Sequence, residues 1–544
     1  MQVVLDTNVS KPALRAHRKT KTGCRTCRIR RVKCDESRPS CIKCSSTGRK
    51  CDGYPQNQRD LQTHASSYGQ IKSAWPSKAL ASLPDFGNDM RHLEFYYHCI
   101  GPKLSGRFDT EFWSRSILQI AHVEPGVRNA LIALSHLNQS QSGTLQDARR
   151  SANRPNNLKR RPFWINYNKA IRHLIDDIAK PSFSAEAGLV ICLLFACIEF
   201  LQADANMAFT HVRSGLNIVH ELRKQKAGRS RFGLAAASQG QMSARLYEIE
   251  QIMVPILTQA LASALPYGTS IERDFEFLQS CPSYYTGTVF THIADARASF
   301  FDLRNAAILL ARDMAIKLYG SIPIAASDYH RQTDLLNQHR VWLQALKSLE
   351  RTDKWAKDAT YSLSALKIGY YSSYTAVSCI MDETQMAFDA HLENFMSLVA
   401  HAEYLVGSFN FNNCHAPLSP LDAAANFVFD TALIPALFYV AIRCRCPVTR
   451  RKAVDLLALN LPREGLWDSE QHRKVAERVI EIEERKVDPR GWPIAASRLC
   501  RSSVGTDVDE NNGFQASFLY TKDLAAATER AWNERLTLSE SHAK

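Results

Sequence analysis

Beyond residue 88, apolar residues recur at three- and four-residue spacing, which is the pattern of amphipathic helices. Ile249, Ile252, Ile256 and Ala260 form one such series, and Pro255 is expected to kink or split that helix. The clearest predicted helices are Gly126–Leu137, Phe163–Ile178, Ala187–Lys224, Ser243–Leu265, Ile293–Leu318, Leu335–Leu349, Leu363–Ile380, Leu392–Val406 and Asp422–Arg443. Alternating strand patterns are scarce, so we predict a mostly α protein with one large all-α domain.

The first 87 residues lack this helical pattern, and the change suggests the domain boundaries. We predict a basic disordered arm (1–19), a small cysteine-rich module (20–55), a flexible linker (56–87), a helical domain (88–500) and a C-terminal tail with a last helix (501–544). The linker is rich in Gln, Ser, Pro and Asp, and contains no heptad pattern lasting three heptads. It therefore predicts no coiled coil.

The positive charge of the chain is concentrated near its N-terminus. The net charge is +14, and residues 11–60 hold 15 Lys and Arg against four Asp and Glu, which is +11 of that total. A short segment with such an excess points to an acidic partner such as nucleic acid. The run Lys11–Lys33 is also typical of a nuclear import signal, although residues that contact DNA would give the same pattern.

The cysteines are expected to be reduced. Met1–Gly23 has no apolar stretch of seven residues and so predicts no secretory signal, and the longest apolar run, Ala187–Ile198, suits a buried helix better than a membrane span. Without a secretory route the 15 cysteines stay as thiols. Clustered thiols in a reducing compartment are more often metal ligands than disulfides.

The cysteines near the N-terminus form two near-identical halves with the spacing C-x2-C-x6-C-x6-C-x2-C-x6-C. They are Cys24, Cys27, Cys34, Cys41, Cys44 and Cys51. Each half offers three thiolates, one fewer than tetrahedral zinc prefers, so two bridging sulfurs would let six ligands hold two Zn²⁺ ions. The module has too few apolar residues for a core, and metal must therefore supply its folding free energy.

The segment Thr22–Tyr54 resembles the fungal-type binuclear zinc cluster transcription factors. The similarity covers every cysteine spacing, the run Arg28–Cys34, Asp35 and Pro39. It implies that Cys24 and Cys41 bridge the two zinc ions, that Cys27 and Cys34 complete one site, and that Cys44 and Cys51 complete the other. It also implies that CGG-type triplets of double-stranded DNA are recognised in the major groove. Where relatives usually have lysine, this chain has Arg31, which can donate two hydrogen bonds to guanine.

The basic residues around the cysteines are the candidate DNA contacts. A helix over about Arg25–Arg31 would present several of them at its end, where one or two reach bases and the others bind phosphates. The candidates are Arg28, Arg30, Arg31 and Lys33 in the first half of the module, and Lys43, Arg49 and Lys50 in the second.

The helical region resembles the regulatory domain of a subgroup of the same factors, the regulators of secondary-metabolite gene clusters, the aspercryptin type among them. The residues that suggest this are Phe108–Trp113, Glu124–Leu137, Pro435–Leu457 and Arg463–Ser469. We expect Trp113, Leu131, Leu134 and Leu437 to be core residues. Cys444 and Cys446 have no neighbouring ligands for a further metal site. The acidic and aromatic segment Thr506–Phe518 is expected to be a solvated, disordered loop, with contact to the transcription machinery as the alternative.

No common enzyme motif is present: we find no phosphate-binding GxxxxGK[ST], no strand-associated GxGxxG, no HExxH and no GxSxG. The prediction is a nuclear, zinc-dependent transcription factor for RNA polymerase II genes, not an enzyme. A homodimer stays open because the linker predicts no coiled coil. The alternative function is a protein-interaction scaffold whose zinc module binds DNA only nonspecifically.

Overall fold

A computed structural model of the chain describes residues 24–51 except 31, 38 and 39, and residues 89–538 except 106–107, 141–144, 146–147, 149–159, 179, 181–183, 232–239, 265–271, 281–288, 321, 353–354, 409–426, 430–432, 460, 510 and 522–530. It divides into two compact units, Met1–Leu83 and Pro84–Lys544. The predicted arm (1–19) and the predicted linker (56–87) lie outside the described residues.

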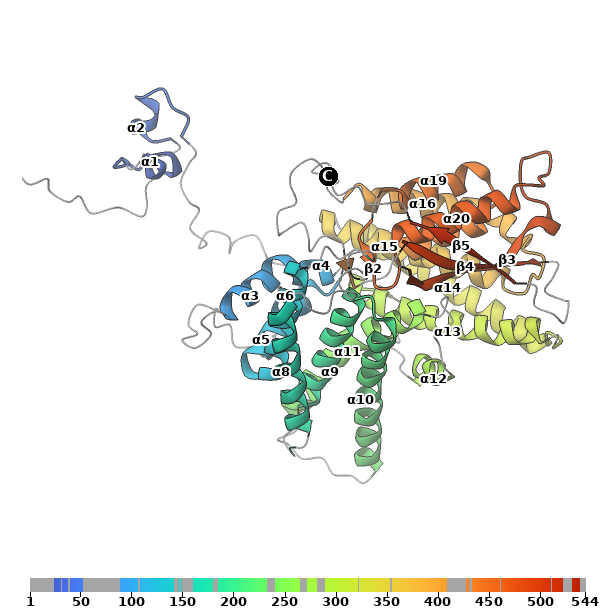
Figure 1. Cartoon of the computed structure of the whole chain (residues 1–544), viewed down its shortest axis with the longest axis horizontal. Helices are drawn as coiled ribbons and strands as arrows, with labels where there is room; N and C mark the ends of the chain where they lie inside the picture. Colours follow the sequence, from blue (N-terminus) through green and yellow to red (C-terminus); the bar gives the residue numbers. More distant parts are fainter. Residues whose placement is uncertain are drawn as a thin grey trace, which may run out of the picture. The chain divides into compact units, whose positions relative to one another are not determined.

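The described part of the N-terminal unit contains two short helices, α1 (Arg25–Ile29) and α2 (Ile42–Ser45) (Figure 1). Its buried side chains are those of cysteines, with Cys51 packed against them. The aliphatic residues Ile29, Val32 and Ile42 are 71%, 42% and 63% exposed, so they do not form a core. Within residues 24–51, sulfur atoms occupy the place that apolar side chains fill in larger domains.

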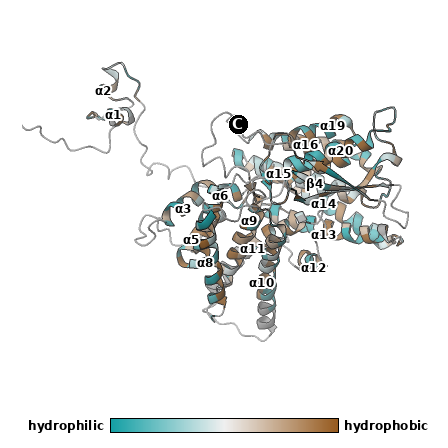
Figure 2. Ribbon diagram, in the orientation of Figure 1, coloured by the Kyte–Doolittle hydropathy of each residue, from teal (hydrophilic) through white to brown (hydrophobic). Residues whose placement is uncertain are grey.

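The larger unit begins with a bundle of helices around α9. The helices are α3 (Asp89–Phe95), α4 (Gly101–Leu104), α5 (Ile117–Val123), α6 (Pro125–Ser140), α8 (Arg161–Ile178), α9 (Ala185–Leu201), α10 (Ala205–Arg231) and α11 (Gly240–Ala264), with π-helical turns at Tyr96–Ile100 and Phe112–Ser116. Every residue of α9 from Ala187 to Leu201 is buried, because α6, α10 and α11 pack around it. Its hydrophobic colour in Figure 2 reflects this central place.

The predicted helix Ala187–Lys224 is two helices, α9 and α10. Ala203 has a positive φ of 62°, and the Asp204 side chain accepts a hydrogen bond from the Met207 N–H at 3.0 Å. This left-handed residue followed by a capping carboxylate ends one helix and starts the next, so α10 packs back against α9. Pro255, by contrast, lies inside α11 without splitting it.

The second half of the larger unit contains longer helices around two apolar clusters. They are α12 (Glu272–Ser280), α13 (Ile293–Tyr319), α14 (Ala326–Thr352), α15 (Lys357–Cys379), α16 (Leu392–Val406), α18 (Ile434–Arg443), α19 (Pro447–Leu457) and α20 (Ser469–Glu483), with 3-10 turns at Ala387–His391 and Ala495–Ser497. One cluster joins α13, α14 and α15, and the other joins α15 to α16, α18, α19 and α20. Among the described residues of the predicted helix Asp422–Arg443, Phe427 and Val428 form a strand and Ile434–Arg443 form α18, where Pro435 suits a first turn.

The mostly α prediction is confirmed, and the four residues expected in the core are buried. Trp113 is 2% exposed, and Leu131, Leu134 and Leu437 are at most 1% exposed. None of the helices in the described part of the chain is long and apolar enough to span a membrane.

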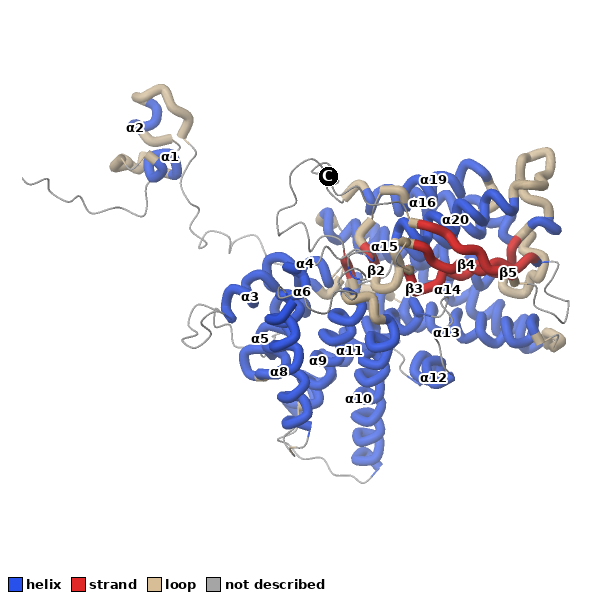
Figure 3. The backbone as a smooth tube through the Cα atoms, in the orientation of Figure 1, coloured by secondary structure: helices blue, strands red, loops and turns tan. Residues whose placement is uncertain are grey.

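The C-terminal region differs from the expected loop and last helix, because its described residues form an antiparallel sheet. The strands β3 (Leu499–Val508), β4 (Gly513–Tyr520) and β5 (Trp532–Thr537) lie side by side in that order (Figure 3). Phe514, Ala516 and Phe518 are buried in alternation with Gln515 and Ser517, which is the period of a strand with one covered face. Asp509 lies after β3, where it accepts backbone hydrogen bonds from Asn511 and Gly513 and pairs with Arg535.

The segment Arg463–Ser469 is a junction between distant helices. Arg463 and Glu464 form the strand β2, which pairs in parallel with β1 (Phe427–Val428). The buried Arg463 guanidinium donates to the Leu201 carbonyl at the end of α9, at 3.1 Å, and the Glu464 carboxylate accepts from the N–H groups of Leu433 and Ile434 at the start of α18. Each charge thus complements a helix terminus.

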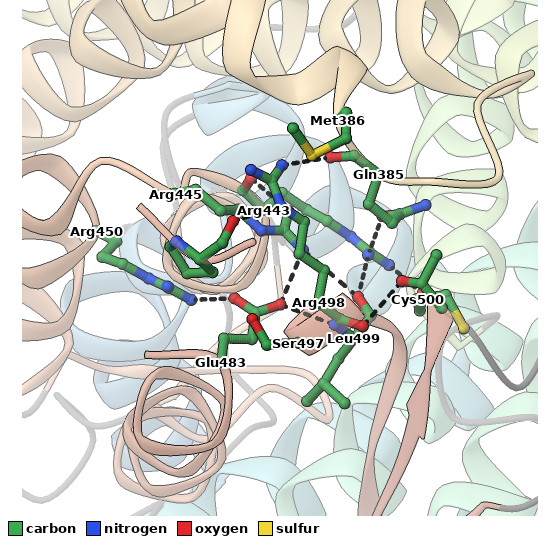
Figure 4. Close-up of polar contacts among 12 residues, drawn as sticks. Gln385, Met386, Arg443, Arg445, Arg450, Glu483, Ser497, Arg498, Leu499 and Cys500 are labelled. Carbon is green, nitrogen blue, oxygen red and sulfur yellow. Dashed lines mark hydrogen bonds and ion pairs between the residues drawn. The ribbon is translucent and has the colours of Figure 1, made fainter. Parts of the chain in front are cut away.

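A cluster of buried arginines holds the sheet to the helices (Figure 4). Glu483, at the end of α20, accepts from Arg445 and Arg450 at 2.9 Å each and from the Leu499 N–H at 2.9 Å. Arg498 makes two hydrogen bonds with Asp389, at 2.7 and 2.8 Å. Although burial raises the pKa of Glu483, the two arginines lower it below its ordinary value. Burial lowers the pKa of Arg445 to about 10.

Candidate metal centre and nucleic-acid interface

The six N-terminal cysteines lie together as two groups of four that share two members. One group contains Cys24, Cys27, Cys34 and Cys41, and the other contains Cys24, Cys41, Cys44 and Cys51. Within each group the sulfur atoms all lie within 4.8 Å of one another. The two shared residues are Cys24 and Cys41, which are the residues that the resemblance implies as bridging ligands.

The sulfur–sulfur distances suit tetrahedral metal sites. The Sγ atom of Cys24 is 3.6 Å from that of Cys41 and 3.8 Å from that of Cys44, and the Cys27 and Cys41 sulfurs are 3.6 Å apart. Four sulfurs at the usual zinc–sulfur distance of about 2.3 Å lie roughly 3.8 Å from one another in a tetrahedron. All six are free thiols rather than disulfides, so the donor set fits zinc.

Backbone N–H groups point at the sulfurs and favour their charged form. The N–H of Cys24 and the N–H of Glu36 donate to the Cys34 sulfur at 3.4 Å each, and the N–H of Cys27 donates to the Cys24 sulfur at 3.3 Å. Burial nevertheless raises the pKa of the Cys24, Cys27 and Cys41 thiols. A bound cation supplies the charge that lets such buried thiols lose their protons.

Asp35 organises the second half of the module. Its carboxylate accepts a hydrogen bond from the Ser37 hydroxyl, and it also accepts from the N–H groups of Ile42 and Lys43 at 3.1 and 2.8 Å. These bonds, with that from Ser37 first, lower the pKa of Asp35. The carboxylate therefore caps α2 from seven residues away. Cys41 occupies the usual capping position without a side-chain bond, so no local sequence pattern indicated this role.

The two halves of the module are also joined by polar contacts between side chains and backbone. The Arg30 guanidinium donates to the Thr47 hydroxyl at 3.3 Å, and the Thr26 hydroxyl donates to the Lys50 carbonyl at 3.3 Å. Arg30, predicted as a DNA contact, is thus half-buried and partly engaged within the module.

Some of the other predicted DNA contacts are exposed, and the side chains of the rest are not among those that the structure describes. Lys33, Lys43, Arg49 and Lys50 are exposed. Arg28 lies in α1, but its side chain is not among those described, and neither is any part of Arg31. α1 ends at Ile29, so it is two residues shorter than the predicted helix.

Comparison with known proteins shows that the module is similar to a known family of domains. Residues 22–61 match the fungal Zn(2)-Cys(6) binuclear cluster domain. The chain is 32% identical over 237 residues to the aspercryptin biosynthesis cluster-specific transcription regulator atnN of Emericella nidulans, which is 38% of this chain and 36% of that protein. It is 64% identical over 133 residues to the Zn(2)-C6 fungal-type transcription factor afumD of Aspergillus fumigatus, covering 23% of this chain and 34% of that protein.

A third relative, the transcription regulator lscL of Purpureocillium lilacinum, is 28% identical over 36% of this chain and 48% of its own length. The chain thus spans about a third to a half of the length of these relatives. No solved structure matches it. The relatives are transcription regulators and not enzymes, and their domain binds zinc through the six cysteines. The chain therefore carries a fungal Zn(2)-Cys(6) binuclear cluster domain and is related to fungal transcription regulators.

Proposed function

We propose that this chain is a zinc-dependent, sequence-specific DNA-binding transcription factor that regulates RNA polymerase II genes, with a secondary-metabolite gene cluster as its target. The observation that carries the proposal is the arrangement of six thiols in two groups that share Cys24 and Cys41. Similarity to a regulator named for the aspercryptin cluster supports the kind of target. We propose a nuclear location, because the DNA that a transcription factor of RNA polymerase II genes binds is in the nucleus.

Two Zn²⁺ ions are the proposed content of the module, one held by each group of four sulfurs. When bound, zinc supplies cross-links that a module without an apolar core otherwise lacks. The chain's own residues then set the surface: Asp35 fixes α2, and the Thr26 and Arg30 contacts fix the two halves against each other. Such a rigid unit is what groove recognition requires.

The proposed DNA surface combines one base-reading residue with several phosphate contacts. Arg31 is assigned to guanine in a CGG-like triplet, because a planar guanidinium matches the guanine O6 and N7 acceptors. Arg28, Arg30, Lys33, Lys43, Arg49 and Lys50 are assigned to positioning on the phosphates. Lys33, Lys43, Arg49 and Lys50 are exposed, which supports that role. A homodimer and contact with the transcription machinery complete the proposed set of partners.

The test is selection from random double-stranded DNA with the zinc-loaded full chain. We expect enrichment of a CGG-like word. Arg31→Ala should lose this preference at a cost of about 1–3 kcal/mol, whereas Lys33→Ala should weaken binding to all sequences alike and lower the salt slope by about one. Lys347→Ala, an exposed lysine of α14, is the matched control and should change neither. If no word is enriched, the module is a nonspecific binder and the scaffold function is favoured.

A further inference from the structure

One face of α8 packs into the helical bundle. Phe163, Tyr167 and Ala170 are buried on that face, and the helix lies mainly against α6. The Tyr167 hydroxyl also donates a hydrogen bond to the Glu199 carboxylate of α9. Spacings of four and three residues place the three buried side chains on one side of a helix. The contact with the bundle therefore uses one side of α8.

A second apolar stripe of α8 is exposed. It consists of Trp164, Ile171, Ile175 and Ile178, and their spacings of seven, four and three residues place them on one face. At 3.6 residues per turn, this face lies about a quarter of a turn from the buried one. Trp164, Ile175 and Ile178 are 42%, 62% and 59% exposed, and Ile171 is half-buried. Single exposed apolar residues are common, but a stripe of four along one helix is typical of a surface that binds another protein.

The charges beside the exposed α8 stripe are opposite at its two ends. Arg161 is the first residue of α8, Asp176 lies near the end of the helix, and both are exposed. Asp177 pairs with Lys180 at 2.6 Å, whereas neither Arg161 nor Asp176 forms an ion pair among the described residues. The helical period places Arg161 and Asp176 on the same flank of the stripe. A stripe that is positive at one end and negative at the other is complementary to its own copy in the antiparallel direction.

We infer that the exposed α8 stripe binds α8 of a second copy of this chain, in an antiparallel pair about a twofold axis. An axis that crosses the helix near residue 169 brings Trp164 level with Ile175 of the second copy to within one residue, which is about 1.5 Å along the helix. The same axis brings Arg161 level with Asp176 of the second copy, again to within one residue. Because the contact is symmetric, each of these pairs forms twice.

Like charges do not oppose this register. Arg172 is exposed on the same flank, and its two copies are about 9 Å apart along the helix direction. The axes of packed helices are a further 8–10 Å or so apart, so the separation exceeds the screening length of about 8 Å at physiological salt. In a parallel pair, by contrast, Arg161 lies level with Arg161 of the second copy. The charges therefore favour the antiparallel pair.

This contact makes the chain a dimer without a coiled coil. The linker contains no heptad pattern lasting three heptads, and pairing through α8 is an alternative to pairing next to the zinc module. The inference deepens the proposed function by assigning an interface to the proposed homodimer, and it rests on that part of the proposal. It depends neither on zinc nor on DNA, because α8 belongs to the larger unit.

The experiment is sedimentation velocity of the zinc-loaded full chain without DNA, over about 0.5–50 μM. Since α8 has 18 residues, one pair of helices forms a small interface, and we expect a monomer–dimer equilibrium with a micromolar Kd. Ile175→Asp should raise the Kd by about tenfold or more, because it places a charge in the apolar contact. Ile316→Asp, at a position of α13 that is 56% exposed, is the matched control and should dimerise as the parent does.

An exchange of charges tests the register. Arg161→Asp and Asp176→Arg each bring like charges together and should each raise the Kd by about fivefold. The variant with both exchanges restores opposite charges, and its Kd should be within about twofold of the parent's. The two residues are roughly 22 Å apart along one helix, so this rescue cannot arise within one chain. Arg351→Asp, at an exposed position of α14, is the control and should have no effect.

Circular dichroism and thermal unfolding establish that each variant is folded. A parent chain that stays monomeric, a parent-like Kd for Ile175→Asp, or a double exchange that dimerises no better than the single exchanges would overturn the inference. DNA selection is measured separately. A dimer that enriches no DNA word would contradict the proposed DNA recognition alone, whereas a monomer that enriches a CGG-like word would contradict the α8 interface alone.

Discussion

The zinc module and the helical body have interiors made of different side chains. In the module, the buried side chains are cysteines, and the aliphatic residues lie on the surface. In the body, α9 is buried on every side by apolar packing, and two large apolar clusters organise the later helices. One chain thus has two kinds of interior, buried sulfurs that fit a metal site in the module and buried apolar side chains in the body.

The two regions also differ in where their positively charged side chains lie. The basic residues described in the module are mostly exposed, where they are available to an acidic partner. In the body, Arg445, Arg450 and Arg498 are at most 1% exposed and are paired with Glu483 and Asp389. Positive charge is thus exposed in one region and part of the interior in the other.

Removal of zinc should have the largest effect of the changes considered, and it should affect the module without affecting the body. A chelator should unfold the module and abolish DNA binding, because structural zinc contributes apparent binding free energy on the order of 10 kcal/mol. The helical body should keep its far-UV circular dichroism and its thermal transition. Zinc content by elemental analysis, DNA affinity and thermal unfolding should be measured on the same samples.

Re-addition of zinc is the control for this experiment, and it should restore DNA binding. A chelated chain that still binds DNA with unchanged affinity would contradict the role of metal. Loss of the body's thermal transition together with zinc would contradict the independence of the two interiors.

Glu483→Gln should have the next largest effect and should act only on the body. It leaves Arg445 and Arg450 buried without their shared counter-charge, and breaking a buried pair in this way costs about 3–5 kcal/mol. The measurement is the free energy of unfolding of the body from urea titration. Zinc content should be unchanged.

Glu481, in the same helix, offers a matched control. Its carboxylate pairs with Arg478, its own side chain is 64% exposed, and exposed pairs contribute at most about 1 kcal/mol. If Glu481→Gln were as destabilising as Glu483→Gln, the buried cluster would not be the source of the effect.

The body should lose stability in mild acid through His472. Burial lowers the pKa of His472 to about 4, and its Nδ1–H donates to the Asp468 carbonyl at 2.7 Å. Because the folded pKa is depressed, the neutral ring contributes fully above the unfolded pKa of about 6.5, and the contribution is lost as the pH falls towards 4. The shift corresponds to about 3 kcal/mol.

This prediction is checked by the unfolding free energy at pH 7, 5.5 and 4.5. His472→Gln should flatten the dependence between pH 6.5 and 4, whereas His330→Gln, at an exposed position, should not. An identical pH dependence in the parent and in His472→Gln would rule out this residue as the cause.

Asp35→Ala should give the smallest effect and should act only on the module. It removes the cap of α2, and we expect a several-fold loss of zinc affinity with the body unchanged. Competition with a zinc chelator of known affinity measures this loss. Ser40→Ala, at a nearby exposed position, is the control and should have the parent's affinity. A parent-like affinity for Asp35→Ala would show that the cap does not support the metal site.

The apolar period predicts the long helices well. It does not predict where a helix breaks or where the chain forms strands instead. Leu392–Val406 was predicted with the bounds that α16 has, whereas the break at Ala203 was missed because alanine is an ordinary helix residue. The C-terminal strands were missed although Phe514, Ala516 and Phe518 alternate. The acidic residues Asp507, Asp509 and Glu510 beside them favour a solvated loop when the sequence is considered alone.

The sequence alone determined the ligand types and their spacing, because a metal site is built from a few residues whose separation along the chain can be counted. It also determined most helices, since their apolar period is local. Only the tertiary structure decided which residues meet: the Asp35 cap, the arginines around Glu483, and the Arg463 contact with α9. Apart from the Asp35 cap, which spans seven residues without a local capping pattern, these features join residues that are far apart in the chain, so neither composition nor period contains them.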